Sequence, residues 1–427
     1  MNSFIIKNGR VIDPASKIDG RFDLLIENGL IADLGKKIKG SKMIDEIDAK
    51  GAIVAPGFID LHVHFREPGF EYKETIATGS ASAAAGGFTS VCCMANTNPV
   101  NDNGAVTTSI LKKAKEAGLV NVFPIGAITK NLEGKELAEI GELKKSGCVA
   151  LSDDGKTIQN SEVMRLALEY AKGFQLPIVS HSLCCDLTGD GVMNEGFVST
   201  ELGLKGIPHE AEEVIIARDI ALAQLTDSPV HIAHISTARG VELIREAKKR
   251  KIRVSCEVTP HHFTLTDEAC RNYDPNTKMA PPLRIKEDIQ AIKKGLVDGT
   301  IDAIATDHAP HSLADKEVGF EQAPCGIIGL ETALPLALKL VHEKIISLTR
   351  MIELFTSRPA KIFNLPRGTL SKKVPADLVI FSTDSSSVYD VYKGFSKSQN
   401  SPFHQWKFRG KVLYTMVGGK IVYRGKT

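Results

Sequence analysis

The feature that most constrains the fold is a regular alternation of apolar runs with amphipathic segments between Phe58 and Val341. Eight runs are typical of strands buried on both faces: 58–65, 89–95, 121–127, 148–154, 177–181, 230–236, 252–258 and 302–308. Helical segments follow them, including 71–85, 162–172, 210–225, 238–251, 287–296 and 330–341. Eight such strand–helix units predict an α/β protein with a closed (β/α)8 barrel of the TIM type.

The two ends of the chain share a different pattern. Residues 1–54 contain short β-type runs broken by Asn-Gly and Asp-Gly, and strands return after Arg367 with a hairpin centred on Gly418-Gly419. We therefore predict one small β-domain formed by both termini, residues 1–54 and 367–427, beside a barrel domain of residues 55–366. The polar segment KGFSKSQNSPF, residues 393–403, is expected to be an exposed loop.

Composition excludes several classes of protein. Of 427 residues, 43% are hydrophobic and 24% charged, which is typical of a soluble globular protein. The 53 basic and 51 acidic residues nearly cancel, so we expect no nucleic-acid and no membrane partner. There is neither a long apolar run nor a secretory signal, which predicts a cytoplasmic protein. The 8 scattered cysteines are expected to be free thiols.

Potential metal ligands gather at the predicted strand ends, where barrels of this type carry their chemistry. His62 and His64 alternate on the first strand and therefore share one face. Further ligand-type residues end other strands: Asp153, Asp154, His181, His234 and Asp307. Histidine nitrogens with carboxylates suit zinc, and a shared carboxylate suits a pair of ions. Such a pair lowers the pKa of a bridging water, as in hydrolases of amides or phosphates.

Other polar residues near these ends suggest substrate contacts. If the first strand continues past His64, Arg66 lies beside the metal ligands, where its guanidinium would bind a carboxylate through two bonds. Its alternative role is a surface salt bridge. Asn96 ends the second strand and would donate a further hydrogen bond, or would simply be a turn residue. The histidines expected to support the core or the ligands are His231, His261, His262 and His308, whereas His209, His342 and His404 are expected at the surface.

Nine motifs, in order, closely resemble those of the class I dihydroorotases of the amidohydrolase superfamily over nearly the whole chain. They are DLHVHFREPG, MANTNP, LSDDG, MNEG, HIAHIS, TPHHF, KMAPPLR, ATDHAPH and GIIGLET. The resemblance implies reversible hydrolysis of (S)-dihydroorotate to N-carbamoyl-L-aspartate in pyrimidine (UMP) biosynthesis.

The resemblance also implies the roles of individual residues. His62, His64 and Asp307 would hold one Zn²⁺, and His181 and His234 a second. An aspartate of LSDDG would bridge them if both are present. The family match, and the opposite orientation of neighbouring strand residues, favour Asp154 over Asp153. Asp307 would be the catalytic proton carrier. The expected substrate-binding residues are His64, Arg66, Asn96, Ala280, His311, Cys325 and Gly326.

The chain departs from the family pattern in its expected pocket. Ala280 stands where many members carry an asparagine, and Cys325 where phenylalanine is common; the segment after His181 also differs. None of these changes removes a metal ligand. The polar segment from Ser312 to Ala323 is expected to close over the substrate.

Two alternatives stay open from the sequence. An allantoinase or dihydropyrimidinase would act on a neutral ring, which would leave Arg66 without a partner. A non-catalytic relative would instead scaffold a protein such as aspartate transcarbamoylase, but the complete ligand set argues against loss of catalysis. We expect a homodimer, and association with aspartate transcarbamoylase stays open. The metal's identity and the occupancy of a second site are likewise open.

Overall fold

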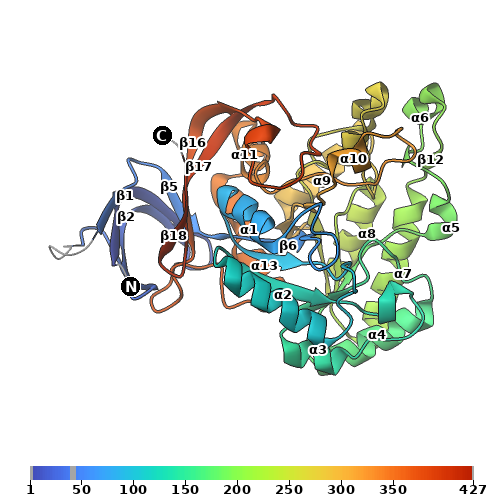
Figure 1. The fold of residues 1–427 in the computed structure, drawn as a ribbon, viewed down its shortest axis with the longest axis horizontal. Helices are drawn as coiled ribbons and strands as arrows, with labels where there is room; N and C mark the ends of the chain where they lie inside the picture. Colours follow the sequence, from blue (N-terminus) through green and yellow to red (C-terminus); the bar gives the residue numbers. More distant parts are fainter. Residues whose placement is uncertain (1–2, 39–44, 426–427) are drawn as a thin grey trace.

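The computed structural model describes residues 3–38 and 45–425 and contains two large sheets (Figure 1). One has eight parallel strands in the order β15-β14-β13-β10-β9-β8-β7-β6. Their bounds are β6 (Phe58–Val63), β7 (Phe88–Cys93), β8 (Asn121–Gly126), β9 (Ala150–Ser152), β10 (Ile178–Ser180), β13 (Val230–Ile232), β14 (Val254–Val258) and β15 (Ala303–Ile304). The predicted TIM-type barrel is confirmed.

Contacts just beyond the last strand close the barrel. Val63 and His308 form a parallel bridge, and the His64 amide donates to the His308 carbonyl at 2.8 Å. The Thr306 amide donates to Asp60 Oδ1 at 3.1 Å. These bonds bring the segment around residue 307 beside the carboxyl end of β6, where the predicted ligands lie.

The helices surround the barrel with bounds close to the predicted ones. They are α1 (Ile76–Ala85), α2 (Gly104–Ala117), α3 (Ile140–Ser146), α4 (Ser161–Gly173), α7 (Glu210–Thr226), α8 (Ala238–Lys249), α9 (Lys286–Asp298) and α11 (Ala333–His342). Helix α1 begins five residues later than the predicted start at Glu71. Thr75 caps it, because its hydroxyl accepts from the Thr78 amide at 3.1 Å while Thr78 Oγ1 accepts from the Thr75 amide at 3.0 Å.

A small insertion between β10 and α7 was not expected from the sequence. It contains α5 (Cys185–Thr188), β11 (Met193–Asn194), α6 (Phe197–Leu202) and β12 (Gly206–Ile207). The buried Arg284 side chain holds it in place, since Nη1 donates to Asn194 Oδ1 at 3.0 Å and to the Ile207 carbonyl at 2.9 Å.

Apolar side chains fill the barrel. One buried cluster joins residues of strands all around the sheet, among them Leu61, Cys92, Ile125 and Val179. Because its members come from strands on every side, this cluster occupies the interior. It also includes Phe363, which follows helices α12 (Leu348–Phe355) and α13 (Ser357–Ile362). The barrel is therefore a packed core rather than a pore.

The second sheet joins both ends of the chain, as predicted. Strand β5 pairs in parallel with β1 and antiparallel with β16. Its strands are β1 (Phe4–Asp13), β2 (Ile18–Glu27), β3 (Leu30–Gly35), β4 (Asp45–Asp48), β5 (Ile53–Pro56), β16 (Leu378–Val388), β17 (Lys407–Val417) and β18 (Lys420–Arg424). The domain limits at 54/55 and 366/367 stay a prediction. Residues 1–2, 39–44 and 426–427 of the predicted β-domain lie outside the described residues.

One expectation about loops is wrong, and a second stays a prediction. The segment 393–403 is not simply exposed, because Ser398, Asn400 and Phe403 are buried. Its polar side chains bind backbone groups of the barrel, which a polar sequence does not reveal. The segment from Ser312 to Ala323 contains α10 (Leu313–Lys316), and the buried Lys316 Nζ donates to the Pro324 carbonyl at 2.7 Å. Much of the segment, including Leu313 and Val318, is nevertheless exposed, and its closure over a substrate stays a prediction.

The cysteines agree with the expectation of free thiols. All of the cysteines are free, and most of them are buried; Cys185 is exposed. Within the described ranges, no helix has both the length and the apolar character to cross a membrane.

An aromatic cluster joins the two sheets, and its loss should measurably destabilise the protein. The Phe58 ring lies 5.0 Å from the Phe355 ring and 5.9 Å from that of Phe381 on β16. Phe58→Ala should lower the free energy of unfolding by about 3–5 kcal/mol, because it leaves a cavity in a close-packed core. Urea titration followed by circular dichroism measures this. Leu225→Ala, at a side chain 65% exposed, is the control and should change stability by less than about 0.5 kcal/mol. Equal midpoints for the two variants would contradict the prediction.

Candidate active site

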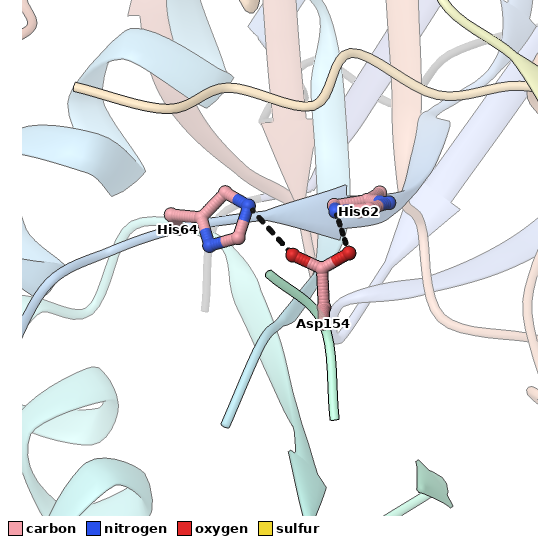
Figure 2. Close-up of side chains that lie close together, drawn as sticks. All are labelled: His62, His64 and Asp154. Carbon is pink, nitrogen blue, oxygen red and sulfur yellow. Dashed lines mark ion pairs between the residues drawn. The ribbon is translucent and has the colours of Figure 1, made fainter. Parts of the chain in front are cut away.

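Four histidines surround one carboxylate at the carboxyl ends of the barrel strands. Asp154 Oδ1 lies 3.4 Å from His62 Nε2, 3.3 Å from His181 Nδ1 and 3.5 Å from His234 Nε2. Asp154 Oδ2 lies 3.3 Å from His64 Nε2. Figure 2 shows His62 and His64 directed toward the same carboxylate. The ligand-type atoms form two groups that share Asp154, one with His62 and His64 and the other with His181 and His234.

The unpaired atoms of this cluster indicate a metal site. His62 Nε2 and Asp154 Oδ1 are buried, and neither has a hydrogen-bond partner in the described structure. Buried polar atoms without partners are costly, so a group that binds both is expected between them. Neutral imidazole nitrogens and a carboxylate oxygen are the ligands that zinc takes in proteins. The residues therefore fit one ion or a pair bridged by Asp154.

The neighbouring Asp153 points elsewhere. Its Oδ1 accepts from the amides of Ile128 at 2.7 Å and Thr129 at 3.0 Å, and its Oδ2 accepts from the Thr129 hydroxyl. Burial raises the pKa of this carboxyl to about 6. Adjacent residues at a strand end face opposite sides. Asp154 therefore faces the histidines, whereas Asp153 binds the loop that contains Ile128 and Thr129.

Asp307, in the segment that follows the last strand β15, completes the cluster. Its Oδ1 lies 3.1 Å from His64 Nε2 and 3.4 Å from His62 Nε2. Its backbone has φ of 47°, in the left-handed region, and His234 has φ of 34°. Such conformations are uncommon for residues other than glycine and store strain that the surrounding fold must hold.

A cavity of about 320 Å³ opens beside the cluster. It is lined by the residues with expected substrate roles, His64, Arg66, Asn96, Ala280, His311, Cys325 and Gly326, together with Asp154, His181, His234 and Asp307. The fold thus brings the predicted set to one place, although it does not by itself assign their roles.

Arg66 reaches this cavity by a route that differs from the expected one. Strand β6 ends at Val63, and Arg66 takes φ of 62° in the loop beyond it. Its Nε donates to the Pro310 carbonyl at 3.1 Å, and its Nη2 lies 3.4 Å from His311 Nε2. Burial lowers the pKa of Arg66 to about 10, so the guanidinium is still charged at neutral pH.

The surroundings of Arg66 favour an anionic ligand. Lys73 Nζ lies 3.3 Å from His311 Nδ1, and the sequence did not single out this lysine. Burial, followed by the nearby charges of Arg66 and Lys73, lowers the pKa of His311 to about 2, so the ring is neutral. Arg66 and the neutral imidazole of His311 therefore form a cationic wall of the site, and Lys73 contacts this wall through His311 without lining the cavity.

Asn96 orients a ligand-type residue as well as facing the cavity. Its Oδ1 lies 2.9 Å from His64 Nδ1, while its Nδ2 donates to the Asp154 carbonyl at 3.4 Å. The carbonyl of a carboxamide accepts hydrogen bonds, so His64 Nδ1 carries the proton and Nε2 presents its lone pair to the cluster.

Comparison with known proteins identifies the family. The family model described as dihydro-orotase-like matches residues 51–240. A protein named dihydroorotase from Geotalea daltonii is 57% identical over 424 residues, which cover 99% of this chain and 100% of that protein. One from Geobacter metallireducens is 54% identical over 422 residues, with the same coverage of both chains. The chain belongs to the dihydroorotase family.

Solved structures support the fold of this dihydroorotase family member. An L-hydantoinase (dihydropyrimidinase) from Arthrobacter aurescens superposes with a TM-score of 0.88 at 26% identity, covering 100% of this chain and 97% of that chain. A dihydropyrimidinase from Brevibacillus agri gives a TM-score of 0.85 at 23% identity, which shows the shared fold alone.

The electrostatics of the cluster suit ligands that must be deprotonated. Burial alone opposes the charge on Asp154, but the facing imidazoles hold its pKa well below its usual range. The same balance keeps the pKa of Asp307 below its ordinary value, with His62 and His64 as the main favourable neighbours. Both carboxyls are therefore ionised at neutral pH, which is the state in which a carboxylate can bind a metal ion.

Glu257 is a supporting residue that the sequence analysis missed. It is fully buried on β14, and its carboxylate lies 2.9 Å from His62 Nδ1 and 3.1 Å from His231 Nε2. Burial opposes its charge, but hydrogen bonds from His231 and His62 hold its pKa at about 2. A carboxylate behind a ligand histidine fixes the tautomer that leaves Nε2 free to bind a metal. In the sequence, Glu257 is a single acidic residue within an apolar strand run, and this is the signal that could have revealed it.

The two aspartates provide a matched test of the metal site. Asp154→Asn should lose most of the bound metal, because the shared carboxylate becomes a weaker, neutral ligand. Asp153→Asn keeps the acceptor oxygen for the two backbone amides, so its metal content should equal that of wild type. Plasma mass spectrometry of the purified proteins gives metal per chain. Wild-type metal content in a folded Asp154→Asn protein would contradict the assignment.

Proposed function

We propose that this dihydroorotase family member is zinc-dependent and interconverts (S)-dihydroorotate and N-carbamoyl-L-aspartate through the residues of this cavity. The observation that carries the proposal is the juxtaposition of the shared Asp154 cluster with a cationic wall in one cavity. The cluster suits hydrolysis of an amide, and the wall suits a substrate with a carboxylate. The high identity with proteins named dihydroorotase supports both parts.

Zinc is proposed from the ligand chemistry. His62, His64 and Asp307 would hold one ion, His181 and His234 a second, and Asp154 would bridge the two. Four imidazoles in one cluster favour zinc over calcium or magnesium, which prefer oxygen ligands. Zinc bound here would supply hydroxide near neutral pH and would polarise a carbonyl oxygen.

Asp307 is proposed as the proton carrier. In ring opening, the attacking water must lose a proton and the departing ring nitrogen must gain one. Asp307 is an ionised carboxylate facing the cavity, so it would take the first proton and deliver it to the nitrogen. In ring closure the same group would begin protonated. An Asp307→Asn protein with full metal content and near-wild-type rates would exclude this role.

The cationic wall is proposed to hold the substrate carboxylate. Arg66 would bind it with two parallel hydrogen bonds, and His311 and Asn96 would add further contacts. The backbone near Cys325 and Gly326, and the methyl group of Ala280, would shape the pocket around the ring. Because the Ala280 side chain has no hydrogen-bonding group, it would add no side-chain hydrogen bond to the ring.

The remaining proposals concern the setting of the enzyme. A cytoplasmic location follows from pyrimidine biosynthesis, and the absence of a membrane-spanning helix in the described ranges is consistent with it. The family resemblance supports a homodimer and leaves association with aspartate transcarbamoylase as a second proposal. Light scattering of the purified protein, with and without aspartate transcarbamoylase, tests both; a monomer alone would refute the first and unchanged mass on mixing the second.

The decisive assay compares three cyclic amides. Metal-replete protein should open dihydroorotate with a kcat/KM at least about 100-fold above that for hydantoin or allantoin, because only dihydroorotate has the carboxylate that pairs with the buried Arg66. Ultraviolet absorbance or chromatography follows each ring opening. Turnover of hydantoin or allantoin without turnover of dihydroorotate would refute the proposed substrate.

Arg66→Lys tests the carboxylate contact directly. Lysine keeps the charge but loses the planar pair of donors, and a hydrogen bond to a charged group contributes about 1.5–3 kcal/mol. We expect kcat/KM for dihydroorotate to fall by about tenfold or more with unchanged metal content. Arg165→Lys, at a half-exposed site on α4, is the matched control and should leave the kinetics unaltered. Undiminished efficiency in Arg66→Lys would show that the carboxylate is held elsewhere.

A further inference from the structure

The connection between β16 and β17 crosses from the small β-sheet to the mouth of the barrel. Figure 1 shows these two strands beside α11. Several contacts attach residues 395–401 of this connection to the barrel, and three of them involve residues 395–398. The Phe395 amide donates to Glu331 Oε1 at 2.8 Å, the Lys397 amide to Glu74 Oε1 at 3.1 Å, and the Ser398 hydroxyl to the Lys73 carbonyl at 2.7 Å. The segment is therefore held along its length.

Asn400 lies at the end of this segment and is only 3% exposed. Its Nδ2 donates to the carbonyls of Ala309 and Gly326, both at 3.0 Å. Its Oδ1 accepts from the His311 amide at 3.0 Å. The Asn400 side chain thus uses both of its donors and its acceptor to bind two separate loops. One loop follows β15, and the other precedes α11.

Both loops form the wall of the cavity. Ala309, His311 and Gly326 line it, whereas Asn400 lies behind them. The loops are also closely packed, because a Cβ at Gly326, where φ is 120°, would meet the Ala309 Cβ at 2.6 Å. A small change in the separation of these loops would therefore move the groups that face the substrate.

We propose that Asn400 is a positioning residue for substrate binding, which acts by setting the relative position of His311 and the Gly326 backbone. The inference rests on the proposed function for the identity of the substrate, an anionic cyclic amide. A carboxamide is suited to the task because it offers two donors and an acceptor in one plane. An aspartate keeps the acceptor but loses both donors, and it places an anion beside two carbonyl oxygens.

A purely structural role and a positioning role predict different kinetics. Loss of a core residue lowers stability and the amount of active enzyme, which lowers the apparent kcat. Loss of a group that positions carboxylate-binding atoms weakens substrate and transition state alike, so it raises KM while kcat changes little.

The experiment compares Asn400→Ala and Asn400→Asp with Ser401→Ala. Ser401 is buried beside Asn400, and its hydroxyl accepts from the Phe403 amide, within its own segment. We expect KM for dihydroorotate to rise about tenfold or more in both Asn400 variants, with kcat within about threefold of wild type and equal metal content. Ser401→Ala should keep wild-type values. A KM within twofold of wild type in the folded Asn400 variants, or a loss confined to kcat, would overturn the proposal.

A second measurement does not depend on turnover. Hydrogen exchange followed by mass spectrometry should show faster exchange in Asn400→Ala for peptides that contain residues 309–311 and 325–328, with no change in α4. Unaltered exchange in those peptides would refute the positioning role.

Wild-type protein that fails to open dihydroorotate would count against the proposed function alone. If neither Asn400 variant folds, Ser398→Ala, which loosens the same segment at Lys73, should show the same rise in KM, and unchanged kinetics would refute the proposal.

Discussion

The site depends on one buried carboxylate shared by four histidines. Asp154 lies within 3.5 Å of ring nitrogens of His62 on β6 and of three histidines that follow β6, β10 and β13, namely His64, His181 and His234. A buried charge is stable only where opposite charges or strong donors surround it, and buried imidazoles in turn need acceptors or a metal. Asp154 and the histidines come together only when the barrel closes, so the formation of the site depends on the fold.

Hydrogen bonds to neighbouring residues fix the orientation of two of these histidines. Glu257 and Asn96 each bind the far nitrogen of a ligand-type histidine, which fixes the ring and directs its Nε2 inward. Three residues that face the cavity, Arg66, His234 and Asp307, take left-handed backbone conformations. Such conformations cost roughly 1–3 kcal/mol each and persist where the surrounding structure enforces them. Here the closure of β15 onto β6 and the bonds of the following loops provide that enforcement.

The small β-sheet contributes to the active site as well as to the fold. Its strands come from both ends of the chain, and the connection between β16 and β17 reaches the cavity wall. A segment that is distant in sequence from every ligand thus contacts the loop that carries His311. The barrel and the terminal strands also share buried apolar contacts, because one hydrophobic cluster contains Phe58 of the barrel together with Val379 and Phe381 of β16.

The sequence by itself determined the eight-stranded barrel, the joined termini and the set of candidate ligands, because these follow from short-range periodicity and from the rule that barrels place chemistry at strand ends. Local pattern shows only that Asp153 and Asp154 face opposite sides, and the choice of Asp154 rested mainly on the family resemblance. It could not find Glu257, Lys73 or Asn400. Their roles arise from contacts between residues far apart in the chain, such as Asn400 with Ala309 and Gly326, and such contacts leave no periodic signal. The tertiary structure alone decided which polar residues support the site, because burial and hydrogen-bond geometry exist only once the chain has closed.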